Sequence, residues 1–397
     1  MIRRKPNMTF HPSYWFSSLG AGGTAVSFFM YLMWMVPHKN TPIPTFADWS
    51  TQLNEGGFMA ALTFASLVGI IVFSILHFAL LFWNIAESTA FKKDLKALVN
   101  TPAEVQLMAI PVTFAMTVNV LFILGALFIP NLWASVELLF PGAIAAFALI
   151  GVYAVRIFVQ YISNMVRSGG YASVDHNHLS ALVSVFTFSM LSVGFAAASA
   201  MSHIAITAAI ATTLSIAFFA FALLIGIIVL SHGINAIMKH GIAEAASPSL
   251  WMLIPILTVL GISWVRLSHG LNHHFGIESS PGSLFLPLTV IFMLQLGVFT
   301  LGYKVMKANH YLTYYLYGDK ENPISFGLVC PGVALFVMGM FWWHIGWVKT
   351  GIIEPFSPAY WIGIGVLFTI QVITISALLK LIRKLLRHPT PTKVAHV

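Results

Sequence analysis

The sequence predicts an all-α integral membrane protein. Two observations support this prediction: the composition and the pattern of apolar runs. Of 397 residues, 58% are hydrophobic and only 8% are charged, and the mean hydropathy is +0.86. A soluble domain normally carries about a quarter charged residues. The apolar residues gather in long runs, and a run of about 20 residues is enough to cross a bilayer as a helix.

Ten such runs fill the chain. We expect transmembrane helices at about 19–37, 57–84, 103–129, 132–164, 178–202, 204–238, 249–268, 283–306, 324–348 and 358–384. Strands of a membrane barrel would be shorter and would alternate in polarity. The first run lacks the small-residue cleavage site of a signal peptide and should stay in the mature protein. Short connections join the runs in pairs, which predicts five helical hairpins in a single polytopic domain, residues 1–397.

The basic residues predict how the helices are oriented. Alternating the ten runs across the membrane leaves Lys39, Arg266 and Lys349 on one side and the other 17 of the 20 lysines and arginines on the opposite side. Basic residues favour the cytoplasmic side, so both termini are expected in the cytoplasm, with the protein in the cell inner membrane. Because the positive charges are dispersed, they indicate contact with anionic membrane lipid rather than with nucleic acid.

Helix-breaking and very small residues concentrate in the odd-numbered runs. They are Gly20, Gly22 and Gly23 in the first run, Pro111 in the third, residues 194–200 from Gly194 to Ala200 in the fifth, Pro255 in the seventh, and Pro331 with Gly332 in the ninth. Proline inside a membrane helix is tolerated where neighbours or a water-filled cavity satisfy the freed carbonyl groups. The odd runs are therefore candidates for the wall of a central pore. Small residues also allow close helix packing, so packing is the alternative interpretation.

This arrangement resembles the tellurite-resistance/dicarboxylate transporter family, which includes TehA and the plant slow anion channels. The closest local likeness is the ninth run, Ser-Phe-Gly-Leu-Val-Cys-Pro-Gly-Val-Ala-Leu from Ser325 to Leu335, with Cys330 where that family usually has phenylalanine. There is a fainter likeness to the TsoY-type branch. The resemblance implies five inner odd helices around a pore, five outer even helices, and a homotrimer.

The resemblance also implies an aromatic gate in the fifth run. The candidates are Phe186, Phe188 and Phe195. Phe188 and Phe195 are seven residues apart and share a helix face, which Phe186 does not, so Phe188 or Phe195 is the favoured obstruction. A phenyl ring can close a narrow apolar pore by steric block and dewetting. With 32 phenylalanines in the chain, ordinary packing is the alternative for each ring.

The acidic residues bear on what could pass through such a pore. Glu137 is expected near the outer end of the fourth run, and Glu87 and Glu104 near the inner interface. No ring of carboxylates can be assembled in the membrane core, which argues against a cation pathway and against a proton-coupled pump. The function predicted is that of an anion channel or transporter of the TehA type, with a small anion as its partner and no cofactor.

The 15 histidines suggest an alternative from another class, a membrane redox protein that binds haem or a transition metal. The candidate ligands are His269, His273 and His274 on the outer side, and His77 and His232 near the inner side. His269 and His273 share a helix face if the seventh helix continues that far, and neutral imidazoles ligate haem iron, zinc or copper. Histidines at membrane interfaces also cap helices and bond backbone carbonyls.

Cys330 is the only cysteine, which excludes an internal disulfide and any multi-cysteine metal site. A thiolate beside Pro331 in a pore helix could act as a nucleophile. A buried lone cysteine is more often a small hydrophobic residue, and that is the favoured interpretation. Neither a phosphate-binding loop nor a catalytic triad motif is present, so an enzymatic function is not favoured.

Overall fold

The computed structural model of the protein describes residues 2–3, 9–168, 179–277 and 281–386. These residues form helices joined by turns, with no β-strand among them. Ten helical segments within this part of the chain are long and apolar enough to cross a membrane. The prediction of an all-α protein with ten candidate membrane spans is confirmed.

In chain order the α-helices are α1 (Trp15–Met35), α2 (Phe46–Glu55), α3 (Gly57–Ala90), α4 (Lys92–Ala97), α5 (Ala109–Phe128), α6 (Val136–Ser168), α7 (Leu182–Met201), α8 (Ala205–His240), α9 (Leu253–Phe275), α10 (Phe285–Ala308), α11 (Val329–Phe341) and α12 (Pro358–Leu386). The 3-10 helices are η1 (Pro12–Tyr14), η2 (Pro102–Met108), η3 (Leu132–Ser135), η4 (Glu244–Met252), η5 (Pro281–Leu284) and η7 (Pro323–Leu328). Two π-helical segments are η6 (Leu312–Tyr317) and η8 (Trp342–Val348).

The seventh span is longer than the sequence predicted. The apolar run was expected to end at residue 268, but α9 continues to Phe275. Gly276 ends it in the left-handed conformation, with a φ of 65°, and its N–H bonds the Leu271 carbonyl. At the other end η4 extends the span back to Glu244.

The connection between the first two spans contains a helix that the apolar runs did not reveal. Helix α2 begins with a capping box, in which the Asp48 carboxylate accepts a hydrogen bond of 2.7 Å from the Thr45 N–H. The indole Nε1 of Trp49 donates to the Leu127 carbonyl at 2.8 Å. This bond ties α2 to the last turn of α5.

Burial divides the spans into two classes. In the odd-numbered spans, 83, 50, 94, 72 and 83% of the best 18-residue window is buried inside the protein. The corresponding values are 50, 22, 28, 22 and 28% for the even-numbered spans. Apart from the second span, the even helices therefore present most of their surface to their surroundings, and α7 is the most enclosed helix in the bundle.

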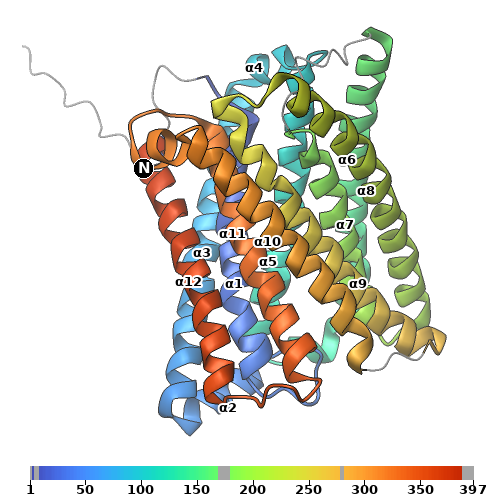
Figure 1. The fold of residues 1–397 in the computed structure, drawn as a ribbon. Helices are drawn as coiled ribbons and strands as arrows, with labels where there is room; N and C mark the ends of the chain where they lie inside the picture. The colour runs from blue at the N-terminus through green and yellow to red at the C-terminus, as the bar shows by residue number, and fades with distance from the viewer. Residues whose placement is uncertain (1, 4–8, 169–178, 278–280, 387–397) are drawn as a thin grey trace, which may run out of the picture.

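Contacts between helices follow the same division. Helix α1 packs on α5, α5 on α7, α7 on α9, α9 on α11, and α11 on α1. Each even-numbered span packs on the odd span that precedes it, as α3 does on α1 and α12 does on α11. Figure 1 shows α3 and α12 at one edge of the bundle and α6 and α8 at the opposite edge. Each odd span thus contacts the next odd span along the chain, and the last one contacts the first.

The odd spans all begin at one end of the bundle, which we call the terminal face because Arg3 and Leu386, close to the two termini, meet there. The N–H of Arg3 donates to the carbonyl of Leu386 at 2.9 Å, and Figure 1 shows the N mark beside the last turn of α12. At this face η1 contacts η2 and η7, η4 contacts η7, and α7 contacts η2 and η4. The five odd spans are therefore parallel to one another.

Three odd spans contain a proline at the equivalent position, in the first turn of the α-helix. Pro111, Pro255 and Pro331 are each the third residue of an α-helix that follows a 3-10 helix. Proline is tolerated in the first helical turn because the N–H groups there have no partner within the helix. The sequence suggested that these prolines interrupt the spans, and their place is instead the passage from 3-10 to α-helix near the terminal face.

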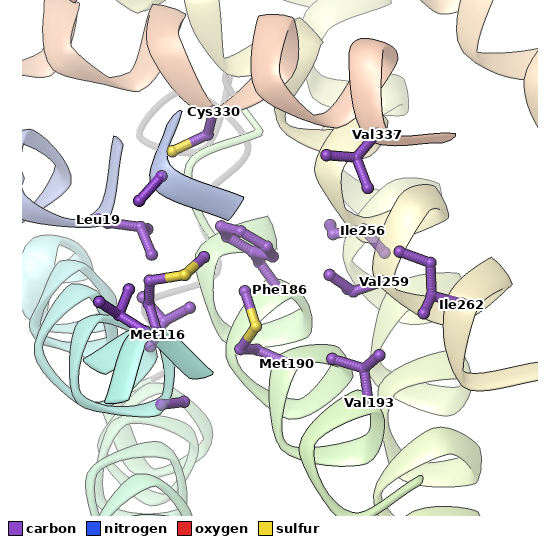
Figure 2. Packing of buried hydrophobic residues seen from close by; sticks show 14 of the residues in the cluster. Leu19, Met116, Phe186, Met190, Val193, Ile256, Val259, Ile262, Cys330 and Val337 are labelled. Carbon is purple, nitrogen blue, oxygen red and sulfur yellow. The ribbon is translucent and has the colours of Figure 1, made fainter. Parts of the chain in front are cut away.

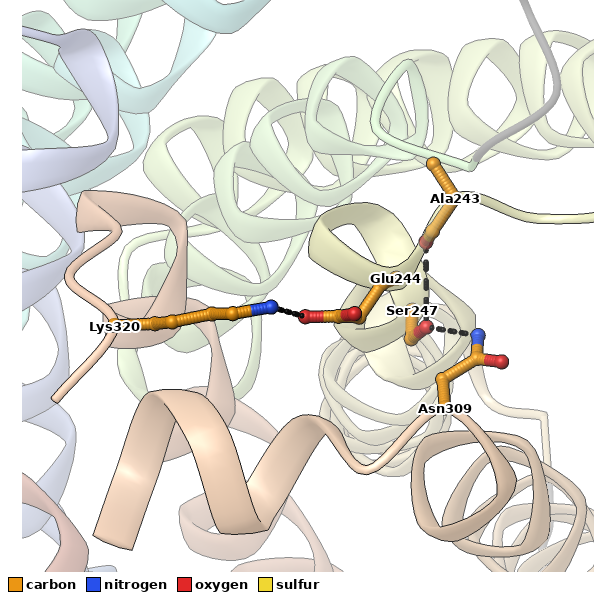
Figure 3. Close-up of polar contacts among 5 residues, drawn as sticks. All are labelled: Ala243, Glu244, Ser247, Asn309 and Lys320. Carbon is orange, nitrogen blue, oxygen red and sulfur yellow. Dashed lines mark hydrogen bonds and ion pairs between the residues drawn. The ribbon is translucent and has the colours of Figure 1, made fainter. Parts of the chain in front are cut away.

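A polar network on the terminal face joins the connection after α10 to η4 (Figure 3). The Lys320 Nζ lies 2.8 Å from a carboxylate oxygen of Glu244, and the Asn309 Nδ2 donates to the Ser247 Oγ at 2.8 Å. The hydrogen bond to Glu244 raises the pKa of Lys320. Since Lys320 is exposed to solvent, the pair orders this connection more than it stabilises the fold.

Candidate functional site

A cavity of about 170 Å³ lies between the odd spans. All five of them, α1, α5, α7, α9 and α11, contribute residues to its wall, and α6 and Ile43 complete it. The lining is predominantly leucine, isoleucine, valine, methionine, phenylalanine, alanine and glycine. Gly20 and Gly23 belong to the wall as well, and each also faces a valine of α11, Val329 or Val333, so that α1 and α11 pack closely.

One charged side chain lines this apolar cavity, and it is Arg266 of α9. Its guanidinium donates a hydrogen bond of 2.9 Å to the carbonyl of Val193 on α7. Within the described part of the chain this is its single hydrogen bond, and no carboxylate pairs with it. A guanidinium has several N–H donors, so most of them remain unsatisfied by the protein.

The position of Val193 fixes the depth of the charge. Val193 is the twelfth of the 20 residues of α7. The Arg266 guanidinium therefore lies near the middle of the bundle, although the sequence analysis placed this residue on the outer side of the membrane. An unpaired charge at such depth costs several kcal/mol and normally marks a functional position.

Two neutral polar residues also line the cavity. The Asn119 amide of α5 has one weak contact, from Nδ2 to the Met190 sulfur at 3.6 Å. The Thr258 hydroxyl is already engaged, since it donates to the Ala334 carbonyl and accepts from the Gln295 amide. Asn119 and Arg266 are thus the polar groups best placed to contact a molecule in the cavity, whose described lining contains no acidic residue.

Of the three gate candidates, Phe186 is the one at the cavity. Figure 2 shows its ring extending from α7 toward Leu19 of α1 and Cys330 of α11. Phe186 lies seven residues nearer the terminal face than Val193, which corresponds to about 10 Å along the helix. Its ring therefore lies between the Arg266 guanidinium and the terminal face.

Phe188 and Phe195 share a helix face, as expected, but that face points away from the cavity. The Phe188 ring stacks on Phe218 of α8 and makes edge-to-face contacts with Phe158 of α6 and Phe221 of α8. The Phe195 ring contacts Phe218 in the same layer. This geometry does not favour Phe188 or Phe195 as the obstruction, because both rings fill the contact between α7 and the outer helices.

Some of the remaining pore candidates line the cavity and others do not. Gly194, Pro255 and Cys330 line the cavity, whereas Pro111 and Pro331 are absent from its described wall. Cys330 is buried among apolar residues. From the sequence, Asn119 could be a polar contact between helices or a dipole in the pore, and the contact between helices was favoured. Arg266 was placed on the outer side, although a lone arginine close to the end of an apolar run was the available signal.

The five candidate metal ligands are distributed over three places. His273 and His274 lie side by side at the end of α9, with Nδ1 and Nε2 3.3 Å apart, and the His203 ring contacts His273. His274 also bonds the Ser202 carbonyl. Across the described residues, no group of three or more histidine, cysteine, aspartate or glutamate side chains could hold a metal ion. His269 belongs to the same helix end.

His77 and His232 lie on different helices and have different surroundings. The fully buried His77 ring of α3 bonds the Ser18 carbonyl at 2.8 Å through Nδ1 and the Thr117 hydroxyl at 3.0 Å through Nε2. It thereby links α3 to α1 and α5. His232 is exposed on α8, where its Nδ1 bonds the Ile228 carbonyl one turn earlier. His77 has the contacts of a packing residue.

Replacing His77 by alanine is expected to lower the stability of the protein by about 2–4 kcal/mol, because the change leaves a cavity and removes hydrogen bonds from buried groups. Thermal unfolding of the detergent-purified protein measures this. The matched control is His232→Ala on the exposed face of α8, which should change stability by less than about 0.5 kcal/mol. Equal effects of the two substitutions would contradict the structural role of His77.

Comparison of the chain with models of protein families found no match, and neither did comparison with curated proteins.

Proposed function

We propose that the protein is an anion channel or transporter of the TehA type, in which a small anion passes between the odd spans. The five pairs of spans would act as hairpins around a central pore, with the cavity as its middle section. The observation that carries this proposal is the lining of the cavity, which holds the cationic Arg266 at mid-depth and no acidic side chain within the described residues.

Electrostatics supports an anion over a cation. A cation in the cavity would meet apolar walls and the positive guanidinium, and its desolvation would be uncompensated. An anion could instead accept the unused N–H donors of Arg266 and approach the Asn119 amide. The parallel odd helices also direct their positive N-terminal ends to the terminal face, which favours anions at that entrance.

A phenylalanine gate forms the second part of the proposal. We assign it to Phe186, whose ring is buried and extends into the cavity (Figure 2). Apolar residues surround the ring, so the closed path would be both narrow and dry. Cytoplasmic termini, residence in the inner membrane and assembly as a homotrimer belong to the same proposal and rest on the basic-residue pattern and on the family resemblance.

Reconstitution into liposomes tests this function. Vesicles loaded with chloride or nitrate should release the anion when they contain the protein, at a rate that increases with the amount of protein incorporated. Vesicles without protein provide the background. Release no faster than this background, from vesicles in which the protein is folded and correctly inserted, would refute the proposed function.

A further inference from the structure

A second hollow lies on the outer surface of the bundle, between α6 and α8, and it is separate from the cavity. Its volume is about 650 Å³. Residues 148–160 of α6 form one wall, Leu214 and Phe218 of α8 form the other, and Phe195 of α7 forms the floor. We call this hollow the α6–α8 groove. The two helices lie at the same edge of the bundle in Figure 1.

The groove is apolar along most of its length and polar at one end. Arg156 and Gln160 lie at the end nearer the terminal face, one helical turn apart on the same side of α6. The exposed Arg156 makes no hydrogen bond or ion pair with any residue that the structure describes. Arg156 lies inside the fourth apolar run, and α6 continues for twelve residues beyond it.

The depth of Arg156 can be judged from a neighbouring contact. Asn164 of α6 donates to the Glu104 carboxylate at 2.9 Å, and Glu104 is in η2, where the third span begins at the terminal face. Arg156 is eight residues further into the bundle, or about 12 Å along the helix. A cationic side chain on the outside of a membrane helix at this depth requires an anionic partner or access to the headgroups.

Among the residues that the structure describes, none is such a partner for Arg156. Of the four most exposed spans, those containing α6, α8, α10 and α12, only the one containing α6 carries an acidic residue within its described length. That residue is Glu137, at the other end of α6, where it accepts hydrogen bonds from the Ser202 hydroxyl and the His203 N–H. A second copy of the protein that packed on this face through one of these four spans would therefore bring no described carboxylate to the level of Arg156. A phosphate of a lipid headgroup carries the required charge.

The dimensions of the groove fit a lipid chain. From Ala148 to Gln160 it follows α6 for about 18 Å, which is close to half the roughly 30 Å thickness of the hydrocarbon core. An acyl chain in the groove would extend from the polar end near the terminal face toward the middle of the bilayer. The valines and Phe218 would contact the chain, while Arg156 and Gln160 would face the headgroup.

We propose that the α6–α8 groove binds one anionic phospholipid from the leaflet at the terminal face, with an acyl chain in the groove and the phosphate bonded by Arg156. The apolar walls hold the chain of any phospholipid, and Arg156 supplies the preference for a net negative headgroup. This site is independent of the anion pathway, since it lies outside the ring of odd spans.

Native mass spectrometry of the detergent-purified, full-length protein tests the proposal. The probes are phosphatidylglycerol and phosphatidylcholine with identical acyl chains. The wild-type protein should retain one phosphatidylglycerol in preference to phosphatidylcholine. Arg156→Gln should reduce that preference roughly tenfold or more, since a hydrogen bond to a charged group is lost. Val155→Trp, which fills the groove, should weaken binding of both lipids.

Arg167→Gln is the matched control, because Arg167 is an exposed arginine at the end of the same helix and does not line the groove. It should leave the lipid preference unchanged. Three results would overturn the proposal: no preference in the wild-type protein, an equal loss in both arginine variants, or an unchanged preference in Arg156→Gln. A lipid-independent oligomer that dissociates in Arg156→Gln would also overturn it, because the groove would then be an interface between copies.

Discussion

Replacing Arg266 by glutamine is expected to lower anion flux through the reconstituted protein about tenfold or more. The substitution removes the one charge that lines the cavity, together with hydrogen bonds that would be worth about 1.5–3 kcal/mol to a bound anion. An anion at mid-depth would then lack compensation for its lost hydration. The initial rate of chloride or nitrate release from liposomes, normalised to folded protein, measures the effect.

Two further variants separate charge from structure. Arg266→Lys keeps the positive charge without the planar guanidinium, so flux should fall less than in Arg266→Gln. Arg167→Gln removes a distant positive charge and should leave flux unchanged. If Arg266→Gln conducts as well as the wild-type protein, the cavity charge has no part in permeation and the proposed pathway is wrong.

Replacing Phe186 by alanine is expected to raise anion flux, because the change removes the ring that extends into the cavity (Figure 2). Lowering the barrier to passage by about 1.4 kcal/mol would raise the rate about tenfold. The same liposome assay measures the increase. A smaller increase in Phe186→Leu would show that the rate depends on the volume of the side chain.

Phe188→Ala and Phe195→Ala provide a demanding control. Each truncates a fully buried ring on the same helix, so each should cost about 3–5 kcal/mol of stability. Neither ring faces the cavity, and flux per folded protein should stay near the wild-type value. Raised flux in all three variants would mean that loosened packing opens the pathway, and raised flux in Phe188→Ala alone would assign the gate to that ring.

The fold was predictable to the extent that it depends on local composition. Long apolar runs avoid water, and in lipid an isolated strand would leave its backbone N–H and C=O groups unpaired. Each run therefore forms a membrane-spanning helix, and the number and approximate limits of these helices follow from the lengths of the runs. The end of α9 did not follow, because Gly276 and its backbone hydrogen bond end the helix seven residues beyond the expected limit at residue 268. Helix α2 was missed because its signal is a capping box and not an apolar run.

The site was less predictable, because helical spacing tells which residues share a face but not which neighbour that face meets. Phe188 and Phe195 were correctly grouped, and their common face meets α6 and α8. Arg266 lies close to the end of its apolar run, where arginines usually reach the headgroups, and only the contact with Val193 reveals its depth. Arg156 lies inside the fourth apolar run, and only the contact between Asn164 and Glu104 shows how far it lies from the terminal face.

The reversal potential of the wild-type protein in a planar bilayer, measured under a gradient of potassium chloride, tests the central proposal most directly. A cavity that holds a guanidinium and no carboxylate in its described lining should pass chloride in preference to potassium, so the potential should approach the equilibrium value for chloride. Arg266→Gln should move it toward zero. A wild-type potential near the equilibrium value for potassium would contradict the proposal.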